Sequence, residues 1–242
     1  MRIFKPIPLV VLYGLVATLA VGEDFWLKKN YRQWSAEETR RLLEDSPWAT
    51  SLTLSSALNV APAISGGAAQ TAPTYASDSV SEPTIVYQIQ FRSAAPVREA
   101  MVRSSQLLSR YDAMSVDQQA AFDANASKFL AVTFPDRVVV SVTFRSNVQN
   151  YQSLLRVYWE GQNAAKLHES VYLNVDKDRL PVQGYAFQGD TFQFIFARPK
   201  TLRPDSQVGV EFIHPTVDQI RNRRVLLDFK VKKMLLNGEP VL

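Results

Sequence analysis

The stretch GYAFQGDTFQFIF, residues 184–196, decides the fold because its aromatic residues pair across one central turn. A two-residue turn at its Gly-Asp pair places Phe187 opposite Phe192. The same turn places Tyr185 opposite Phe194. Residues directly opposite in an antiparallel pair share a face, so a slip of one residue would expose a row of rings. Each ring gains roughly 1.5–3 kcal/mol on burial, and the sequence therefore predicts this hairpin in this register.

A second hairpin is expected just upstream, with a turn at 177–178 that pairs Leu173 with Val182. The apolar residues of its second strand are even-numbered, whereas the aromatic residues that follow are odd-numbered. The buried face must therefore switch between the two hairpins. A β-bulge at Gly184 would make that switch, because a bulge adds one residue to one strand.

The rest of the chain after residue 84 mixes strand and helix patterns. Alternating apolar residues predict further strands at 85–91, 138–144, 208–212 and 227–231, and apolar residues three and four apart predict helices at 97–111 and 115–129. Residues 148–166 fit either pattern, and we favour a helix on length. Asn237-Gly238 predicts a short closing hairpin. The predicted fold class is α+β: an antiparallel-rich sheet, sandwich-like or a partly open barrel, flanked by two to three amphipathic helices, plus an N-terminal helical arm.

The opening of the chain has the layout of an export signal. Arg2 and Lys5 precede an apolar run over 7–21 that ends in small residues. As a helix this run reaches roughly 22 Å, short of the roughly 30 Å hydrocarbon core of a bilayer. We therefore expect residues 1–22 to be a cleaved signal peptide, with no stable membrane span afterwards, and the mature protein to be periplasmic or secreted.

Composition divides the remainder into three parts. Residues 23–54 form an aromatic helical arm, in which Ser35 and Glu38 predict a capping box at the start of a helix. Residues 55–83 are dominated by Ala, Ser, Gly, Pro and Thr, and predict a disordered linker because they offer little large apolar surface to bury. Residues 84–242 are the expected main domain.

The arm supplies the candidate interaction surface. Its aromatic rings could stack on a glycan, line a groove on an envelope protein or rest at a membrane interface, and the alternative is that they bury against the main domain. The candidate residues are Trp26, Tyr31, Trp34 and Trp48.

Catalytic signatures are missing from the sequence. The chain has no cysteine, no nucleophile elbow, no metalloprotease motif and no phosphate-binding glycine loop. His168 and His214 are its two histidines, and neither has a partner at metal-ligand spacing. Asp176 and Asp178 begin like a calcium loop, but the central glycine and the final glutamate are absent, so a hairpin turn explains them better. The sequence predicts no catalytic, metal or cofactor residue.

Charge also limits the partners. The chain has 27 Lys and Arg against 23 Asp and Glu, a net charge of +4, and two of the bases are Arg2 and Lys5 in the expected signal. The bases that remain nearly balance the acids, which is too little excess for a polyanion partner. Nucleic acid is therefore not an expected partner. The absence of cysteine excludes a disulfide framework.

Two parts of the chain resemble a group of short bacterial exported proteins of uncharacterised function. The opening shares WSAEE at 34–38, the leucine pair at 42–43 and SPWA at 46–49, and the later part shares SVYL at 170–173, the Gly-Tyr pair at 184–185 and residues 194–199. This resemblance implies a bacterial, extracytoplasmic setting. It transfers no catalytic or binding residue.

The sequence favours a non-catalytic binding or scaffolding module of the cell envelope. A hydrolase or transferase is the first alternative, and it would need a pocket in which His168 or His214 meets an acid. A small apolar-ligand carrier is the second, and it would need a closed apolar cavity inside the sheet. The sequence leaves the oligomeric state and the identity of any ligand open.

Overall fold

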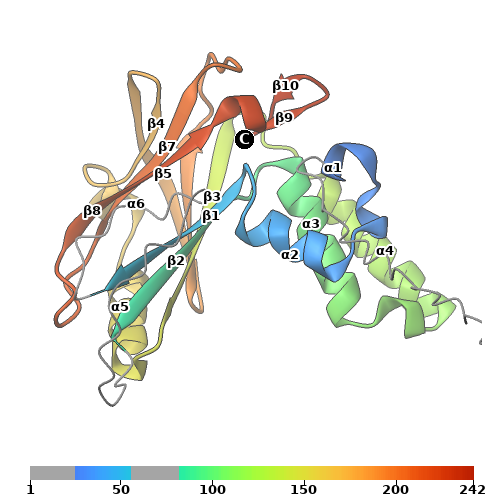
Figure 1. The fold of residues 1–242 in the computed structure, drawn as a ribbon, viewed down its shortest axis with the longest axis horizontal. Coiled ribbons are helices and arrows are strands. Elements are labelled where there is room, and N and C mark those ends of the chain that lie inside the picture. Colours follow the sequence, from blue (N-terminus) through green and yellow to red (C-terminus); the bar gives the residue numbers. More distant parts are fainter. Residues whose placement is uncertain (1–24, 56–81) are drawn as a thin grey trace, which may run out of the picture.

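The computed structural model describes residues 25–55 and 82–242. The expected signal at 1–22 and nearly all of the expected linker at 55–83 lie outside these residues. The described chain is an α+β structure, as predicted, built on one eight-stranded antiparallel sheet (Figure 1). The strand order is β1-β2-β3-β6-β5-β4-β7-β8. These strands are β1 (Ala49–Ser55), β2 (Thr84–Phe91), β3 (Arg137–Ser146), β4 (Tyr172–Val175), β5 (Asp178–Gln188), β6 (Thr191–Ala197), β7 (Gln207–His214) and β8 (Arg223–Lys230).

The sheet curls into a half-barrel. The evidence is that strands far apart in the strand order contact each other across the interior. The rings of Phe91 in β2 and Phe229 in β8 lie 4.9 Å apart, although β3, β6, β5, β4 and β7 intervene in the sheet. Tyr87 in β2 contacts Phe212 in β7 in the same way, at 5.2 Å. Apolar side chains therefore fill the concave side of the sheet.

The helices occupy two places. In Figure 1, α1 to α4 gather beside β1, β2 and β3, whereas α5 lies at one end of the half-barrel. The indole of Trp159 in α5 reaches the interior and stacks on Phe192 at 4.0 Å. The helices are α1 (Phe25–Lys28), α2 (Ala36–Glu44), α3 (Ala95–Leu108), α4 (Val116–Ala131), α5 (Gln149–Glu160) and α6 (Ala164–Leu167), with 3-10 turns at Tyr31–Gln33, Tyr111–Ala113 and Val231–Lys233.

The aromatic hairpin has the predicted register. Phe187 pairs with Phe192 and Tyr185 pairs with Phe194 across the turn at Gly189, whose φ of 64° suits glycine. The predicted bulge is also confirmed, since the register shifts between Val182 and Gly184. The hydrophobic pattern thus fixed both the pairing and the switch of face.

In the upstream hairpin the turn lies one residue earlier than predicted, at 176–177 instead of 177–178. Leu173 pairs with Leu180 rather than with Val182, and the turn falls at Asp176 and the residue after it. Asp176 adopts a left-handed φ of 52°, which Asp tolerates better than most residues. Its carboxylate accepts hydrogen bonds from the Ser206 hydroxyl and the Gln207 backbone N–H, and these distant contacts fix the turn.

The end of the N-terminal arm differs from the helical prediction. Residues 49–55 form β1, which pairs with β2 along its whole length. Leu52 and Leu54 of this strand are buried, and their spacing of two is the strand signal. The arm therefore contributes an edge strand to the sheet of the expected main domain.

Helix signals elsewhere agree with the structure. Both capping boxes form, at Ser35 with Glu38 and at Ser115 with Gln118. Helix α5 confirms the helical choice for most of 148–166. The closing turn at Asn237 joins β9 (Leu235–Leu236) to β10 (Glu239–Pro240).

A buried carboxylate ties four strands together on the outer face of the sheet, namely β4, β5, β7 and β8. Glu211 in β7 is 2% exposed, and it accepts hydrogen bonds from Arg179 at 2.5 Å, Arg224 at 2.7 Å and Asn174 at 2.9 Å. Burial by itself raises the pKa of Glu211, but these hydrogen bonds outweigh it and lower the pKa to about 2. The carboxylate is therefore charged at neutral pH.

Replacing Glu211 with glutamine is expected to lower the free energy of unfolding by about 1–3 kcal/mol at pH 7, because the charge-assisted hydrogen bonds are lost. Urea denaturation would measure this. The pKa of Glu211 is lower in the folded state than in the unfolded state. The stability that the Glu211 carboxylate contributes is therefore fully present above pH 4.5 and is lost as the pH falls towards 2, so the difference between wild type and Glu211→Gln disappears over the same range. The exposed Glu169→Gln is the control, expected within about 0.5 kcal/mol of wild type. An equal effect of both variants would contradict the role of Glu211.

Candidate functional site

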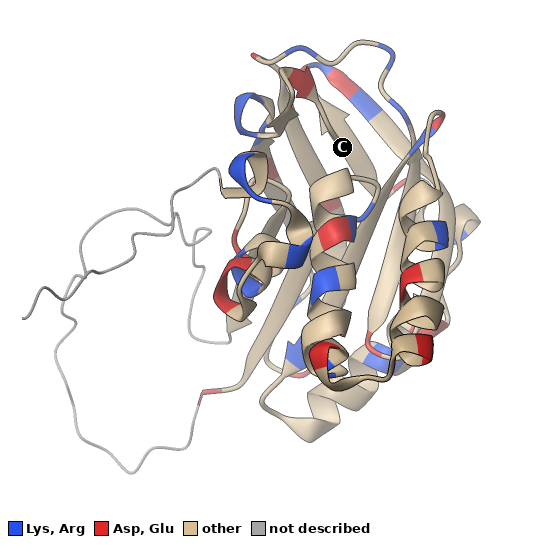
Figure 2. Cartoon of the chain, turned by 90° about the vertical axis from the view of Figure 1, so that its right-hand side faces the viewer, with Lys and Arg blue, Asp and Glu red and all other residues tan. Residues whose placement is uncertain are grey.

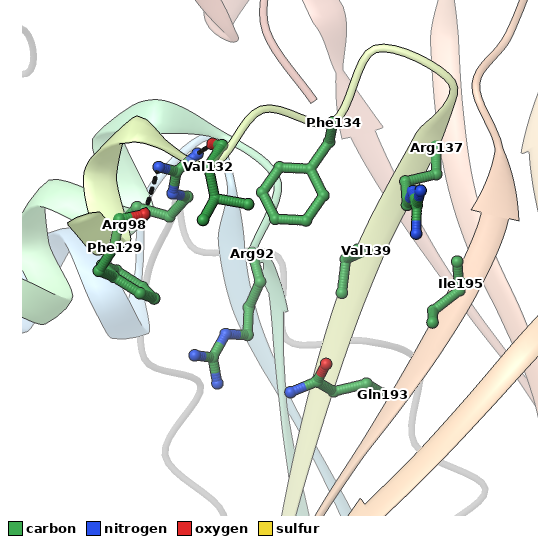
Figure 3. Close-up of a pocket in the computed structure, with 9 residues that line it drawn as sticks. All are labelled: Arg92, Arg98, Phe129, Val132, Phe134, Arg137, Val139, Gln193 and Ile195. Atoms are coloured by element: carbon green, nitrogen blue, oxygen red, sulfur yellow. Dashed lines mark hydrogen bonds between the residues drawn. The ribbon is translucent and has the colours of Figure 1, made fainter.

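Two adjoining cavities lie on the outer face of the sheet, opposite its filled interior. The first has a volume of about 230 Å³ and lies between the α3–α4 layer and strands β3 and β6 (Figure 3). The second, of about 350 Å³, continues over β5 and β6. Arg92 and Gln193 line both cavities. We call this pair of cavities the Arg92 groove.

The two cavities differ in polarity. The first is walled mainly by apolar side chains, namely Phe129, Val132, Phe134, Val139 and Ile195, together with Arg98 and Arg137. Apart from the shared Arg92 and Gln193, the second is lined by Ala186, Phe187, Gln188 and Thr191. The groove therefore has an apolar part and a polar part, and Arg92 lies where they meet.

Strand alternation explains which side chains reach the groove. In β3 and β6 the even-numbered residues, such as Val140 and Phe194, are buried in the interior of the half-barrel. The odd-numbered Val139, Gln193 and Ile195 consequently point to the outer face. The groove is thus a direct consequence of strand register.

Arg98 has a structural role at one wall. Its side chain is buried, and its guanidinium donates to the backbone carbonyls of Phe129, Leu130 and Val132 at the end of α4. Phe134 packs against its guanidinium, with the ring centroid 5.4 Å away. Cations bound to the last carbonyls of a helix stabilise that end, so Arg98 holds α4 in place.

Arg137 also has a partner. Its Nε donates to the carboxylate of Asp136 at 3.1 Å on the exposed rim of the cavity.

Arg92 differs from Arg98 and Arg137 because its guanidinium has no partner in the part of the chain that the structure describes. It is half-buried, and among the residues that the structure describes its guanidinium has neither a hydrogen bond nor an ion pair. Burial lowers the pKa of Arg92 with no nearby carboxylate to oppose the shift.

Figure 3 shows the geometry around this free guanidinium. The Gln193 amide extends towards Arg92, and the Phe134 ring lies on the other side of the cavity. No Asp, Glu or His lines either cavity. The arrangement can bind an anion by a charge-assisted hydrogen bond, with an amide nearby as a second polar group.

The tryptophan side chains of the arm lie inside the molecule, and Tyr31 lies at its edge. Trp34 and Trp48 are fully buried, Trp26 is 9% exposed and Tyr31 is half-buried. Trp48 packs edge-on against Trp26 at 5.5 Å, and its indole donates to the backbone carbonyl of Val241 at 2.7 Å. These four residues are therefore not presented together as an external surface, in keeping with the burial alternative.

The two histidines lie near a hydroxyl and a backbone carbonyl rather than in contact with an acid. His214 is fully buried, and its Nδ1 lies 2.8 Å from the hydroxyl of Tyr87. His168 is exposed, and its ring nitrogen lies 3.4 Å from the backbone carbonyl of Val182. Neither histidine contacts a carboxylate within the described ranges, so the histidine–acid pair that the hydrolase alternative would need is not formed there.

Across 25–55 and 82–242, no group of three or more His, Asp or Glu side chains is placed to hold a metal ion. No helix in these two ranges is long and apolar enough to cross a bilayer. Figure 2 shows basic and acidic residues interspersed along the helices that face the viewer.

The sequence pattern did not predict the Arg92 groove. Arg92 follows the alternation of β2 as one more polar residue, and nothing in its neighbours marks it as unpaired. The same holds for Gln193, which is an ordinary outward position of the hairpin. Their proximity depends on the pairing of β2, β3 and β6, which brings distant segments together.

The fold and the groove describe an α+β half-barrel with a candidate anion-binding groove on its outer face. Comparisons of the chain with protein-family models, with curated proteins and with solved structures give no match.

Proposed function

We propose that this protein is a non-catalytic binding module of the bacterial cell envelope and that the Arg92 groove holds its ligand. The observation that carries the proposal is the half-buried, unpaired guanidinium at the junction of the two cavities. An unpaired charge that is partly removed from water is unfavourable in the free protein. A bound anion would offset that cost, which is the behaviour of a binding residue rather than a structural one.

The sequence supports the envelope setting. Residues 1–22 have the layout of an export signal, and the similarity to short bacterial exported proteins agrees with it. The partner in the periplasm or outside the cell could be a small molecule, a glycan or an envelope protein. The groove favours a small molecule, because its two cavities are of ligand size.

Cell fractionation with intact-mass measurement tests the setting. The protein is expected outside the cytoplasm, with a mature N-terminus near Glu23. Leu12→Arg places a charge in the apolar run and is expected to keep the full-length chain in the cytosol. Wild-type protein found in the cytosol with its first 22 residues intact would exclude the envelope role.

A further inference from the structure

We infer that the ligand of the Arg92 groove is a small amphipathic monoanion, with one carboxylate at one end and an apolar body of about six to ten carbons. This inference rests on the proposed function and specifies its ligand. Three features of the groove support it: the separation of its apolar and polar parts, its volume and the number of free cations.

The positions of the apolar and polar cavities determine how the ligand would be oriented in the groove. The apolar wall of Phe129, Phe134 and Ile195 belongs to the first cavity, whereas Gln188 and Thr191 belong to the second. A molecule whose charged end is at Arg92 can place its apolar body in the first cavity and leave water in the second. A fully polar anion would leave the apolar wall in contact with water, which is unfavourable.

Volume sets the size of the apolar body. An apolar cavity of about 150 Å³ accepts benzene. The first cavity measures about 230 Å³, which leaves room for a ring with a short chain or for a medium-length alkyl chain. Longer chains would exceed this volume.

The free cation sets the charge. Arg98 donates to the backbone at the end of α4, and Arg137 is paired with Asp136, so Arg92 is the remaining guanidinium of the groove. One guanidinium matches one carboxylate, which it can bind through two parallel hydrogen bonds. The Gln193 amide can add a further hydrogen bond to the same group.

Titration calorimetry with octanoate tests the inference on the mature protein. Octanoate is expected to bind with a dissociation constant on the order of 0.1–1 mM, at least about tenfold more tightly than acetate, which lacks the apolar body, or octanamide, which lacks the charge. Arg92→Gln is expected to weaken octanoate binding by about tenfold or more. Arg137→Gln is the matched control, because it removes an arginine of the same cavity that already has a partner, and it is expected to change affinity less than about twofold.

The melting temperature without ligand separates binding from structure. An arginine that stabilised the fold would lower it when replaced, whereas Arg92→Gln is expected to leave it unchanged or raise it, since the unpaired charge is removed. Equal affinities for octanoate and octanamide would overturn the anionic end, and equal affinities for octanoate and acetate would overturn the apolar body. Unchanged octanoate binding in Arg92→Gln would overturn the site. Each of these results leaves the fractionation test of the envelope role unaffected.

Discussion

Trp159→Ala is expected to lower the free energy of unfolding by about 3–5 kcal/mol, the largest effect of any single substitution considered for this protein. Trp159 is fully buried, and its indole stacks on Phe192 at 4.0 Å and lies 6.0 Å from Phe212. Removing it would leave a cavity at the point where α5 closes the half-barrel. Urea denaturation at pH 7.5 measures the difference.

A control on the same helix separates packing from helix formation. Leu154 is 46% exposed in α5, and Leu154→Ala is expected to change stability by no more than about 0.5 kcal/mol. If Trp159→Ala fails to fold, Trp159→Phe provides a smaller loss that can be measured. A cost below about 1 kcal/mol for Trp159→Ala would contradict the packing of α5 in the interior.

Lowering the pH from 7.5 to 5.0 is expected to remove about 2 kcal/mol of stability through His214 alone. The imidazole is fully buried, and burial, with a smaller effect of the nearby Arg223, lowers its pKa from 6.5 to about 4. The folded state therefore holds His214 neutral, whereas the unfolded chain binds a proton near pH 6.5. This stability is fully present above pH 6.5 and is lost as the pH falls towards 4.

Two variants isolate this titration. His214→Gln is expected to flatten the pH dependence by the same amount. Tyr87→Phe removes the hydrogen bond to Nδ1 but keeps the imidazole buried, so the pH dependence should persist in that variant. If wild type and His214→Gln have the same slope between pH 7.5 and 5.0, the imidazole is not held neutral in the folded protein.

The local patterns of the sequence predicted much of the fold. The aromatic hairpin, the bulge at Gly184 and the two capping boxes follow from spacing within a few residues, because alternation and turn chemistry act over that range. The turn at Asp176 was misplaced because its position depends on Ser206 and Gln207, which are thirty residues away. The edge strand β1 was missed because it lies directly after a strong helix signal.

The candidate site depended on tertiary structure. The sequence directed attention to Trp26, Tyr31, Trp34 and Trp48, because exposed aromatic residues are common in binding surfaces. The structure buries the three tryptophans, leaves Tyr31 half-buried, and brings an arginine that no sequence pattern marks beside an apolar cavity. Burial and the absence of a partner are properties of the folded chain, and one sequence does not encode them as a pattern.

The sequence by itself determined the α+β class, the antiparallel hairpins and the faces of the strands, because side-chain alternation and turn residues act locally. Tertiary structure alone decided that the sheet curls until Phe91 meets Phe229, that the arm packs inside and that Arg92 is left without a counter-charge. The physical reason is that long-range contacts depend on how strands pair and pack, and the pairing of β2, β3 and β6 joins residues more than forty positions apart.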